Sequence, residues 1–214
     1  MKKHKQEKSP LFLISLLILI LVGIGYLYYD KNHMGFFQII SLDQTLVVYI
    51  DNIERKSKND INPEFKIKKG MHNIIISKDN YWPWTKEIEI SSQEKLEINP
   101  FFVPLNTSGF LIGPEDPEYK VILDNFKENL ISIEALDKIS TIEIKSQVKA
   151  IDFYKDREDV ILMALAEGVY ALGIDYETEQ NLQPIYKGKD PVFVKKDDNS
   201  IYVLDNGNLM EVSY

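Results

Sequence analysis

The sequence of 214 residues contains no cysteine. Disulfide bonds, thiolate metal sites and lipid-modified cysteine anchors are therefore excluded. A protein of this kind outside the cytoplasm must be stable by packing alone. That is more typical of a prokaryotic cell-surface protein than of a small eukaryotic ectodomain with disulfide bonds.

Basic residues are too few to balance the acidic ones. The chain has 25 lysines and arginines against 33 aspartates and glutamates, and a formal net charge of -8. Four of the lysines lie within the first ten residues, so the remainder is more acidic still. Nucleic-acid binding requires a basic face, and we therefore expect no nucleic-acid partner.

Histidine is scarce, and His4, His33 and His72 are far apart in the chain. This spacing predicts neither a metal site nor a Ser-His-Asp arrangement. A glycine-rich phosphate loop, a nucleophile elbow and a His-Glu-x-x-His motif are all missing from the sequence. We expect no catalytic residue, no metal ligand and no cofactor, and hence no enzyme. The alternative is an envelope hydrolase that uses acidic residues, since two carboxylates can meet from any spacing.

One long hydrophobic run is present, from Leu11 to Tyr29. As a helix it spans about 28 Å, close to the thickness of the bilayer's hydrocarbon core. The pattern predicts a transmembrane helix over 11–29 in contact with the lipid bilayer. A signal peptide cleaved near Gly23 or Gly25 is the alternative, although the apolar core of such a peptide is usually shorter.

Charge sets the expected orientation of this segment. Lysines dominate residues 1–10, and tyrosines cluster at the far end of the run at positions 26, 28 and 29. The positive-inside rule then predicts a cytoplasmic tail over 1–10 and an extracytoplasmic region after a linker over 30–42. The expected location is the cell membrane, with a single pass.

Residues 43–104 have the pattern of a small antiparallel β module. About five short runs alternate apolar and polar residues or are rich in β-branched residues, at intervals of about 10–15 residues. Polar turns separate them, such as Asp51-Asn52 and Asp79-Asn80. Helical periodicity is absent, which favours a β-sandwich-like module.

This module resembles a PEGA domain, a small β module of bacterial and archaeal surface proteins. The matching stretches are Val48 to Asn52, Asn62-Pro63, Lys69-Gly70 followed by 72–76, and Asn80 to Trp84. The sequence departs from the family where Asp43 to Leu46 replaces Pro-Glu-Gly-Ala, and where Asn52 and Asn80 replace glycines. Asparagine tolerates the left-handed backbone that such turns require.

Residues 105–214 contain strand-like runs that recur after about 41 residues, from Ile151 to Val192. A period of about 40 with four strands per unit is typical of β-propeller blades, which these units resemble. The turn Asp205-Asn-Gly207 between two apolar runs predicts a hairpin. In the looser stretch before the repeat we expect a hairpin from 119–123 to 131–134 and a helical turn over 135–139. Too few blades are present to close a ring, so the units either close by association or form a compact antiparallel sheet.

The whole pattern predicts an all-β fold with an N-terminal transmembrane α-helix, in which a small antiparallel β module precedes antiparallel blade-like sheet units. The expected function is non-catalytic: display of these modules for interaction with an envelope protein or a polysaccharide. Tyr81, Trp82 and Trp84 are the candidate partner contacts, since exposed aromatic side chains anchor interfaces. The alternative is that one or two of these rings fill the core of the module.

Overall fold

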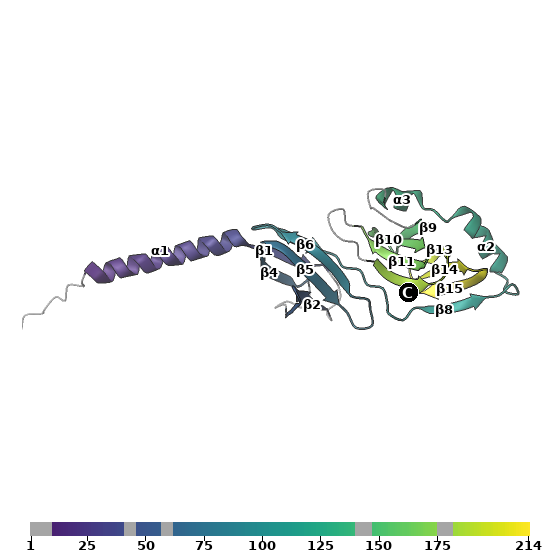
Figure 1. The fold of residues 1–214 in the computed structure, drawn as a ribbon, viewed down its shortest axis with the longest axis horizontal. Helices are drawn as coiled ribbons and strands as arrows, with labels where there is room; N and C mark the ends of the chain where they lie inside the picture. The colour runs from purple at the N-terminus through teal and green to yellow at the C-terminus, as the bar shows by residue number, and fades with distance from the viewer. Residues whose placement is uncertain (1–9, 41–45, 57–61, 140–146, 175–181) are drawn as a thin grey trace, which may run out of the picture. The chain divides into compact units, whose positions relative to one another are not determined.

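The computed structural model describes residues 10–40, 46–56, 62–139, 147–174 and 182–214. The chain divides into two compact units. The first consists of Met1–Ile40, Ser57–Met71 and Glu89–Ile98, and the second of Ser41–Lys56, His72–Ile88 and Asn99–Tyr214. Most of the described elements are β-strands (Figure 1).

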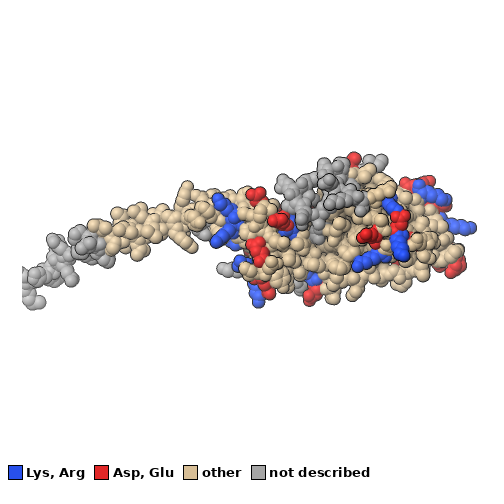
Figure 2. All heavy atoms as spheres, viewed as in Figure 1, with Lys and Arg blue, Asp and Glu red and all other residues tan. Residues whose placement is uncertain are grey.

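Helix α1 (Pro10–His33) begins the described chain. Its large apolar side chains from Ile14 to Tyr29 are between 46% and 72% exposed. Most of its length shows no acidic or basic side chain on the face drawn in Figure 2. The many leucine and isoleucine residues of this stretch favour a helical backbone, and the helix therefore continues through its two glycines.

The expected membrane span needs correction. Within the described residues, no helix has both the length and the apolar character that crossing a membrane requires. This finding contradicts the predicted transmembrane helix over 11–29 and, with it, the predicted single-pass location with a cytoplasmic N-terminus and an extracytoplasmic C-terminal region.

The first unit contains a three-stranded sheet in the order β4-β1-β7. Its strands are β1 (Met34–Ile39), β4 (Glu64–Lys68) and β7 (Lys95–Ile98). The central strand β1 pairs antiparallel with β4 and parallel with β7. The rings of Phe37 and Phe65 stack with their centroids 4.9 Å apart. Residues 34–39 are therefore a central strand, whereas the sequence predicted a linker there.

A four-stranded sheet in the order β3-β2-β5-β6 follows. It consists of β2 (Val47–Ile50), β3 (Ile53–Arg55), β5 (Gly70–Ser77) and β6 (Trp84–Ile90). Asn52 and Asn80 have φ angles of 64° and 66°, which confirms that asparagine supplies the left-handed turns here. Residues 43–45 of the segment compared with Pro-Glu-Gly-Ala lie outside the described residues.

The C-terminal part of the second unit contains two antiparallel four-stranded sheets (Figure 1). One has the order β12-β11-β10-β9 and consists of β9 (Ala150–Tyr154), β10 (Arg157–Leu165), β11 (Gly168–Gly173) and β12 (Leu182–Lys187). The other has the order β13-β14-β15-β8 and consists of β13 (Val192–Asp197), β14 (Ser200–Asp205), β15 (Asn208–Ser213) and β8 (Ser108–Ile112).

The second of these sheets shows how the repeat is completed. The turn at Asn206 and Gly207 joins β14 to β15, with φ angles of 49° and 79°, as the predicted hairpin requires. The fourth strand does not come from the repeat itself, because β8 pairs with β15 from more than ninety positions earlier in the chain. The first sheet is thus a four-stranded meander of consecutive strands, whereas the second adds the earlier strand β8 to the three consecutive strands β13, β14 and β15.

Two helices lie on these sheets and correct the all-β expectation. Helix α2 (Tyr119–Glu128) buries Ile122 and Phe126 against Val194, Tyr202 and Leu209. Helix α3 (Ile133–Ile139) buries Ala135 against Ile151 and Ile161.

The hairpin predicted over 119–134 is wrong for a physical reason. Val121 and Ile122 are β-branched and resemble a strand locally, but the i, i+4 spacing of Ile122 and Phe126 suits one helical face. The helical turn expected over 135–139 does form, as part of α3. Residues 141–145 alternate apolar and polar side chains in the sequence, as a strand does, but they lie outside the described residues.

Candidate functional site

The three aromatic residues singled out from the sequence do not share one exposed surface. Trp84 opens β6 and is only 6% exposed, so its ring belongs to the core. The Tyr81 ring is half-buried, lies 4.1 Å from Lys78 Nζ and meets Phe102 edge-on. The Trp82 amide donates to the Val103 carbonyl at 2.9 Å. Tyr81 and Trp82 thus lie against the segment that follows β7, and their role as partner contacts stays a prediction.

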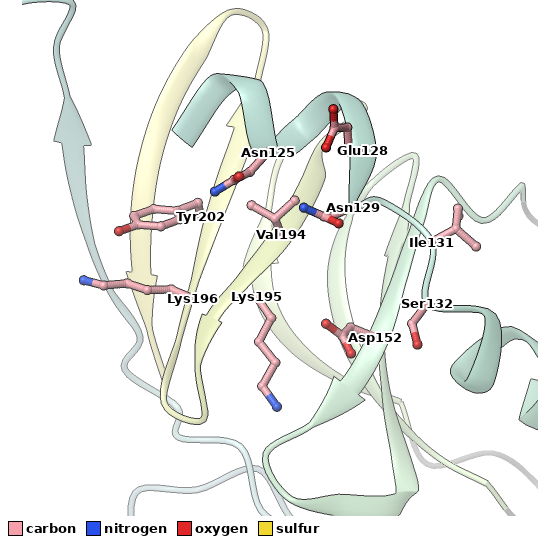
Figure 3. A pocket seen from close by; sticks show the side chains of 10 residues that line it. All are labelled: Asn125, Glu128, Asn129, Ile131, Ser132, Asp152, Val194, Lys195, Lys196 and Tyr202. Atoms are coloured by element: carbon pink, nitrogen blue, oxygen red, sulfur yellow. The ribbon is translucent and has the colours of Figure 1, made fainter. Parts of the chain in front are cut away.

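A polar pocket lies instead beside the C-terminal end of α2 (Figure 3). Its volume is ≈ 490 Å³. This size falls within the range of about 300–1,000 Å³ that small-molecule sites usually have. Its lining consists of Asn125, Glu128, Asn129, Ile131, Ser132, Asp152, Val194, Lys195, Lys196 and Tyr202.

Regular elements fix most of this lining. The last turn of α2 presents Asn125, Glu128 and Asn129 to one side of the pocket (Figure 3). Helix α2 is itself fixed, because Phe126 is buried on the sheet below. The opposite side comes from β13 and from Tyr202 of β14, and Asp152 of β9 lies at the base as Figure 3 is drawn.

The connection between the two helices is also held in place. The Ile151 amide donates to the Leu130 carbonyl at 2.8 Å, and the Ser132 amide donates to the Ile151 carbonyl at 2.9 Å. Residues 130–132 therefore run alongside β9 in the manner of a short parallel strand, which the bridge between Ile131 and Ile151 also shows. The Ser132 hydroxyl accepts a hydrogen bond from the Ala135 amide at 3.4 Å, as an N-cap of α3 does.

Both lysines of the pocket are paired with carboxylates. Lys195 Nζ donates to the Lys155 carbonyl at 2.8 Å and lies 3.1 Å from Asp198 Oδ1. Lys196 Nζ lies 2.6 Å from Glu211 Oε1, and this hydrogen bond raises the pKa of Lys196. The positive charge on this side of the pocket is therefore already neutralised.

The acidic side chains of the pocket differ in this respect. Within the described part of the chain, neither Glu128 nor Asp152 forms a salt bridge; the neighbouring Lys127, whose salt bridge is with Asp124, interacts with Glu128 through its charge alone. Asp152 accepts a hydrogen bond from the neighbouring Phe153 amide at 2.7 Å. The C-terminal end of α2, with its partial negative charge, lies on the same side as Glu128. This side of the pocket is consequently rich in hydrogen-bond acceptors and favours a cation.

The lining presents amide, carboxyl, hydroxyl and ammonium groups, which can form hydrogen bonds and ion pairs. Its ten residues include no histidine and no cysteine. Among the described residues, no group of three or more histidine, cysteine, aspartate or glutamate side chains is placed to hold a metal ion. His72 of β5 forms a hydrogen bond through Nδ1 with Asp51 Oδ2 at 2.7 Å, at the β2–β3 turn and outside this lining.

Comparison of the chain with protein-family models, with curated proteins and with solved structures gives no match. The pocket must therefore be interpreted from its own geometry.

None of the ten lining residues was singled out from the sequence. The pocket depends on α2, which was expected to be a hairpin. It also brings together residues 125–132, 152 and 194–202, whose proximity no local pattern reveals. One feature of the sequence did indicate a polar helix face at this site. The helical spacing of Ile122 and Phe126 places the polar residues Asn125 and Asn129 on a neighbouring face of α2.

Proposed function

We propose that this chain is a non-catalytic binding protein, and that the pocket beside α2 holds a positively charged group of its partner. The observation that carries this proposal is the difference in pairing within the lining. Lys195 and Lys196 form salt bridges with carboxylates, whereas neither Glu128 nor Asp152 forms a salt bridge among the described residues, and Glu128 interacts with the exposed neighbouring Lys127 through its charge alone. A cation in the pocket completes that pairing.

The size and charge of the site favour a basic side chain as the bound group. A volume of ≈ 490 Å³ is large enough for the side chain of a lysine or arginine with part of its backbone. Asn125, Asn129 and Ser132 supply further hydrogen-bonding groups for the peptide. A formal net charge of -8 on the chain also favours the approach of a basic partner. The partner class is therefore a protein or peptide with exposed basic residues.

The resemblances noted above agree with an interaction protein but do not identify its ligand. We propose that residues 43–104 form a PEGA-like β-sandwich module and that 105–214 derive from propeller-like units. Both kinds of fold commonly serve as scaffolds for binding, although a fold alone does not determine a function. The ligand assignment rests on the pocket.

The experiment is a calorimetric titration with blocked tripeptides that differ in one charge. The probes are Gly-Lys-Gly, Gly-Arg-Gly and Gly-acetyllysine-Gly, each acetylated and amidated at its ends. We expect the two charged peptides to bind at least about tenfold more tightly than the acetyllysine peptide, which corresponds to about 1.4 kcal/mol. The double variant Glu128→Gln/Asp152→Asn should lose this difference.

The matched control is Glu54→Gln/Asp79→Asn, which removes the same charge from exposed positions away from the pocket. This variant should keep the preference. Equal binding of all three peptides, or the same loss in both double variants, would show that the pocket does not select a cation. Mass spectra of the peptides after titration test the other half of the proposal, because cleavage would contradict a non-catalytic role.

A further inference from the structure

Strand β8 forms one edge of its sheet and has an unusually apolar surface. It lies beside β15 at the end of the order β13-β14-β15-β8 (Figure 1). Phe110 is 66% exposed and Leu111 is 73% exposed. Alternate residues of an edge strand direct their amide and carbonyl groups away from the sheet. β8 therefore offers hydrogen-bonding groups next to two large apolar side chains.

The other edge strands of the described sheets differ from β8 in composition. Edge strands commonly carry charged residues or proline, which discourage pairing with another chain. Seven described edge strands follow this rule: β3 with Glu54 and Arg55, β4 with Glu64, Lys66 and Lys68, β6 with Lys86, Glu87 and Glu89, β7 with Lys95 and Glu97, β9 with Asp152, β12 with Pro184 and Lys187, and β13 with Lys195, Lys196 and Asp197. The sequence of β8 is Ser-Gly-Phe-Leu-Ile and contains neither. Its edge is the one among these eight that lacks protection.

We propose that β8 pairs antiparallel with β8 of a second copy of this chain, about a two-fold axis that passes beside Phe110. The two sheets then join into one sheet of eight strands. An edge strand that adds a further strand gains main-chain hydrogen bonds along its whole length. A two-fold axis makes the contact self-complementary and closes the assembly as a dimer.

Small and large side chains are arranged along β8 so that the strand is complementary to a second, antiparallel copy of itself. With Phe110 on the axis, the two Phe110 rings face each other on one side of the sheet. Leu111 then lies opposite Gly109 on the other side, and Ile112 lies opposite Ser108. Each large aliphatic side chain thus meets a small residue, and the central pair is aromatic, a combination that favours cross-strand pairing.

Charge near the axis does not oppose this dimer. Glu211 is the residue of β15 that lies opposite Phe110. Its carboxylate is held by Lys196 at 2.6 Å. No charged residue lies within β8 itself. The two copies therefore meet along an uncharged strand, despite the acidic balance of the whole chain.

Single cysteine substitutions test both the contact and its register, because the chain has no cysteine of its own. The full-length Phe110→Cys variant is treated with a mild oxidant and analysed on a non-reducing gel. Directly opposed residues in antiparallel strands have Cβ atoms about 4.5–5.5 Å apart, close enough for a disulfide after a small adjustment. We expect a crosslinked dimer for Phe110→Cys, in a yield that rises with protein concentration.

Two further variants serve as controls. Ser108→Cys lies on the same strand, but two copies of residue 108 are far apart in this register and should not crosslink. Leu182→Cys is 44% exposed on the edge strand β12, which contains Pro184, and should not crosslink either. Equal crosslinking at positions 108, 110 and 182, or none at 110, would overturn the proposal.

A second measurement does not depend on disulfide geometry. Phe110→Lys places two like charges at the axis and should convert the dimer to a monomer of 24.9 kDa in analytical ultracentrifugation. Leu182→Lys adds the same charge to β12 and should leave the dimer intact. A monomeric parent chain, or equal effects of the two substitutions, would contradict pairing through β8.

Discussion

At the scale of single residues, Gln183 joins two distant parts of the second unit. It is 1% exposed on β12. Its Oε1 accepts a hydrogen bond from the Val103 amide at 2.7 Å, and its Nε2 donates to the Phe101 carbonyl at 3.2 Å. One amide side chain therefore satisfies two buried groups of the segment after β7.

We predict that Gln183→Leu lowers the free energy of unfolding by about 1–3 kcal/mol, because the Val103 amide and the Phe101 carbonyl lose their buried partners. Urea denaturation followed by tryptophan fluorescence measures this change. Gln183→Glu retains the acceptor and loses the donor, so a loss is expected there too. An unchanged midpoint in Gln183→Leu would contradict the role of this side chain.

Arg157 holds the same segment from another strand. It donates to the Asn99 carbonyl at 2.6 Å and to the Pro100 carbonyl at 2.8 Å, and Nε lies 2.9 Å from Asp159 Oδ1. Burial of Asp159 opposes its ionisation, but the hydrogen bond and the charge of Arg157 outweigh burial and lower the pKa of Asp159.

We predict that Asp159→Asn destabilises the fold at neutral pH and that the difference from the parent chain shrinks on acidification. A carboxyl with a lowered pKa in the folded state contributes stability above its unfolded pKa of about 4, and this contribution is lost as the pH falls through the folded value. Denaturation of both chains between pH 7 and pH 2.5 measures the effect. A difference in the free energy of unfolding that grows toward low pH would contradict this prediction.

At the scale of elements, α2 depends on its buried face. Phe126 and Val121 lie on the same helix, but Phe126 is 7% exposed and Val121 is 65% exposed. The packing of α2 on β13, β14 and β15 also positions one side of the pocket.

We predict that Phe126→Ala costs about 3–5 kcal/mol of stability, the usual range for removing a buried aromatic ring. Val121→Ala is the matched control and should change stability by less than about 0.5 kcal/mol. Thermal denaturation followed by circular dichroism distinguishes them. Similar effects of the two substitutions would mean that α2 does not pack on the sheet as described.

The elements also show what the sequence could predict. The hairpin at Asn206-Gly207 and the left-handed turns at Asn52 and Asn80 follow from local backbone preferences, which a short stretch of sequence contains. Most strands after residue 46 follow from alternation in the same way. Helix α2 was missed because its β-branched residues outweighed a short helical pattern.

Long-range pairing could not be predicted. Strand β1 has partners about 30 and 60 positions later in the chain, and β8 pairs with a strand near the C-terminus. The segment of β1 was expected to be part of a linker, and no strand was predicted at β8, because a strand of five or six residues acquires its place in a sheet from partners far away in the chain. The pocket was beyond prediction for the same reason.

At the scale of the whole molecule, α1 contributes little to the packing of the β-rich part. The described side chains from Ile14 to Tyr29 are exposed, whereas the first buried residues of unit 1 lie in β1. Removing a helix with exposed side chains leaves no cavity behind.

We predict that a chain beginning at Asn32 keeps the strand signal and the thermal midpoint of the full chain within about 2 °C. It should also be more soluble, because a large exposed apolar surface is removed. Circular dichroism and light scattering measure the two properties. A fall in the midpoint of more than about 5 °C would show that α1 supports the β-rich part.

The central claim is that the acceptor-rich pocket beside α2 binds a cation, and amide chemical-shift mapping tests it most directly. The chain beginning at Asn32, labelled with ¹⁵N, is titrated with the blocked Gly-Arg-Gly peptide. The account predicts the largest shifts at residues 125–132, 152, 194–196 and 202, and their disappearance in Glu128→Gln/Asp152→Asn. Shifts centred on another part of the molecule, or no shifts at millimolar peptide, would contradict it.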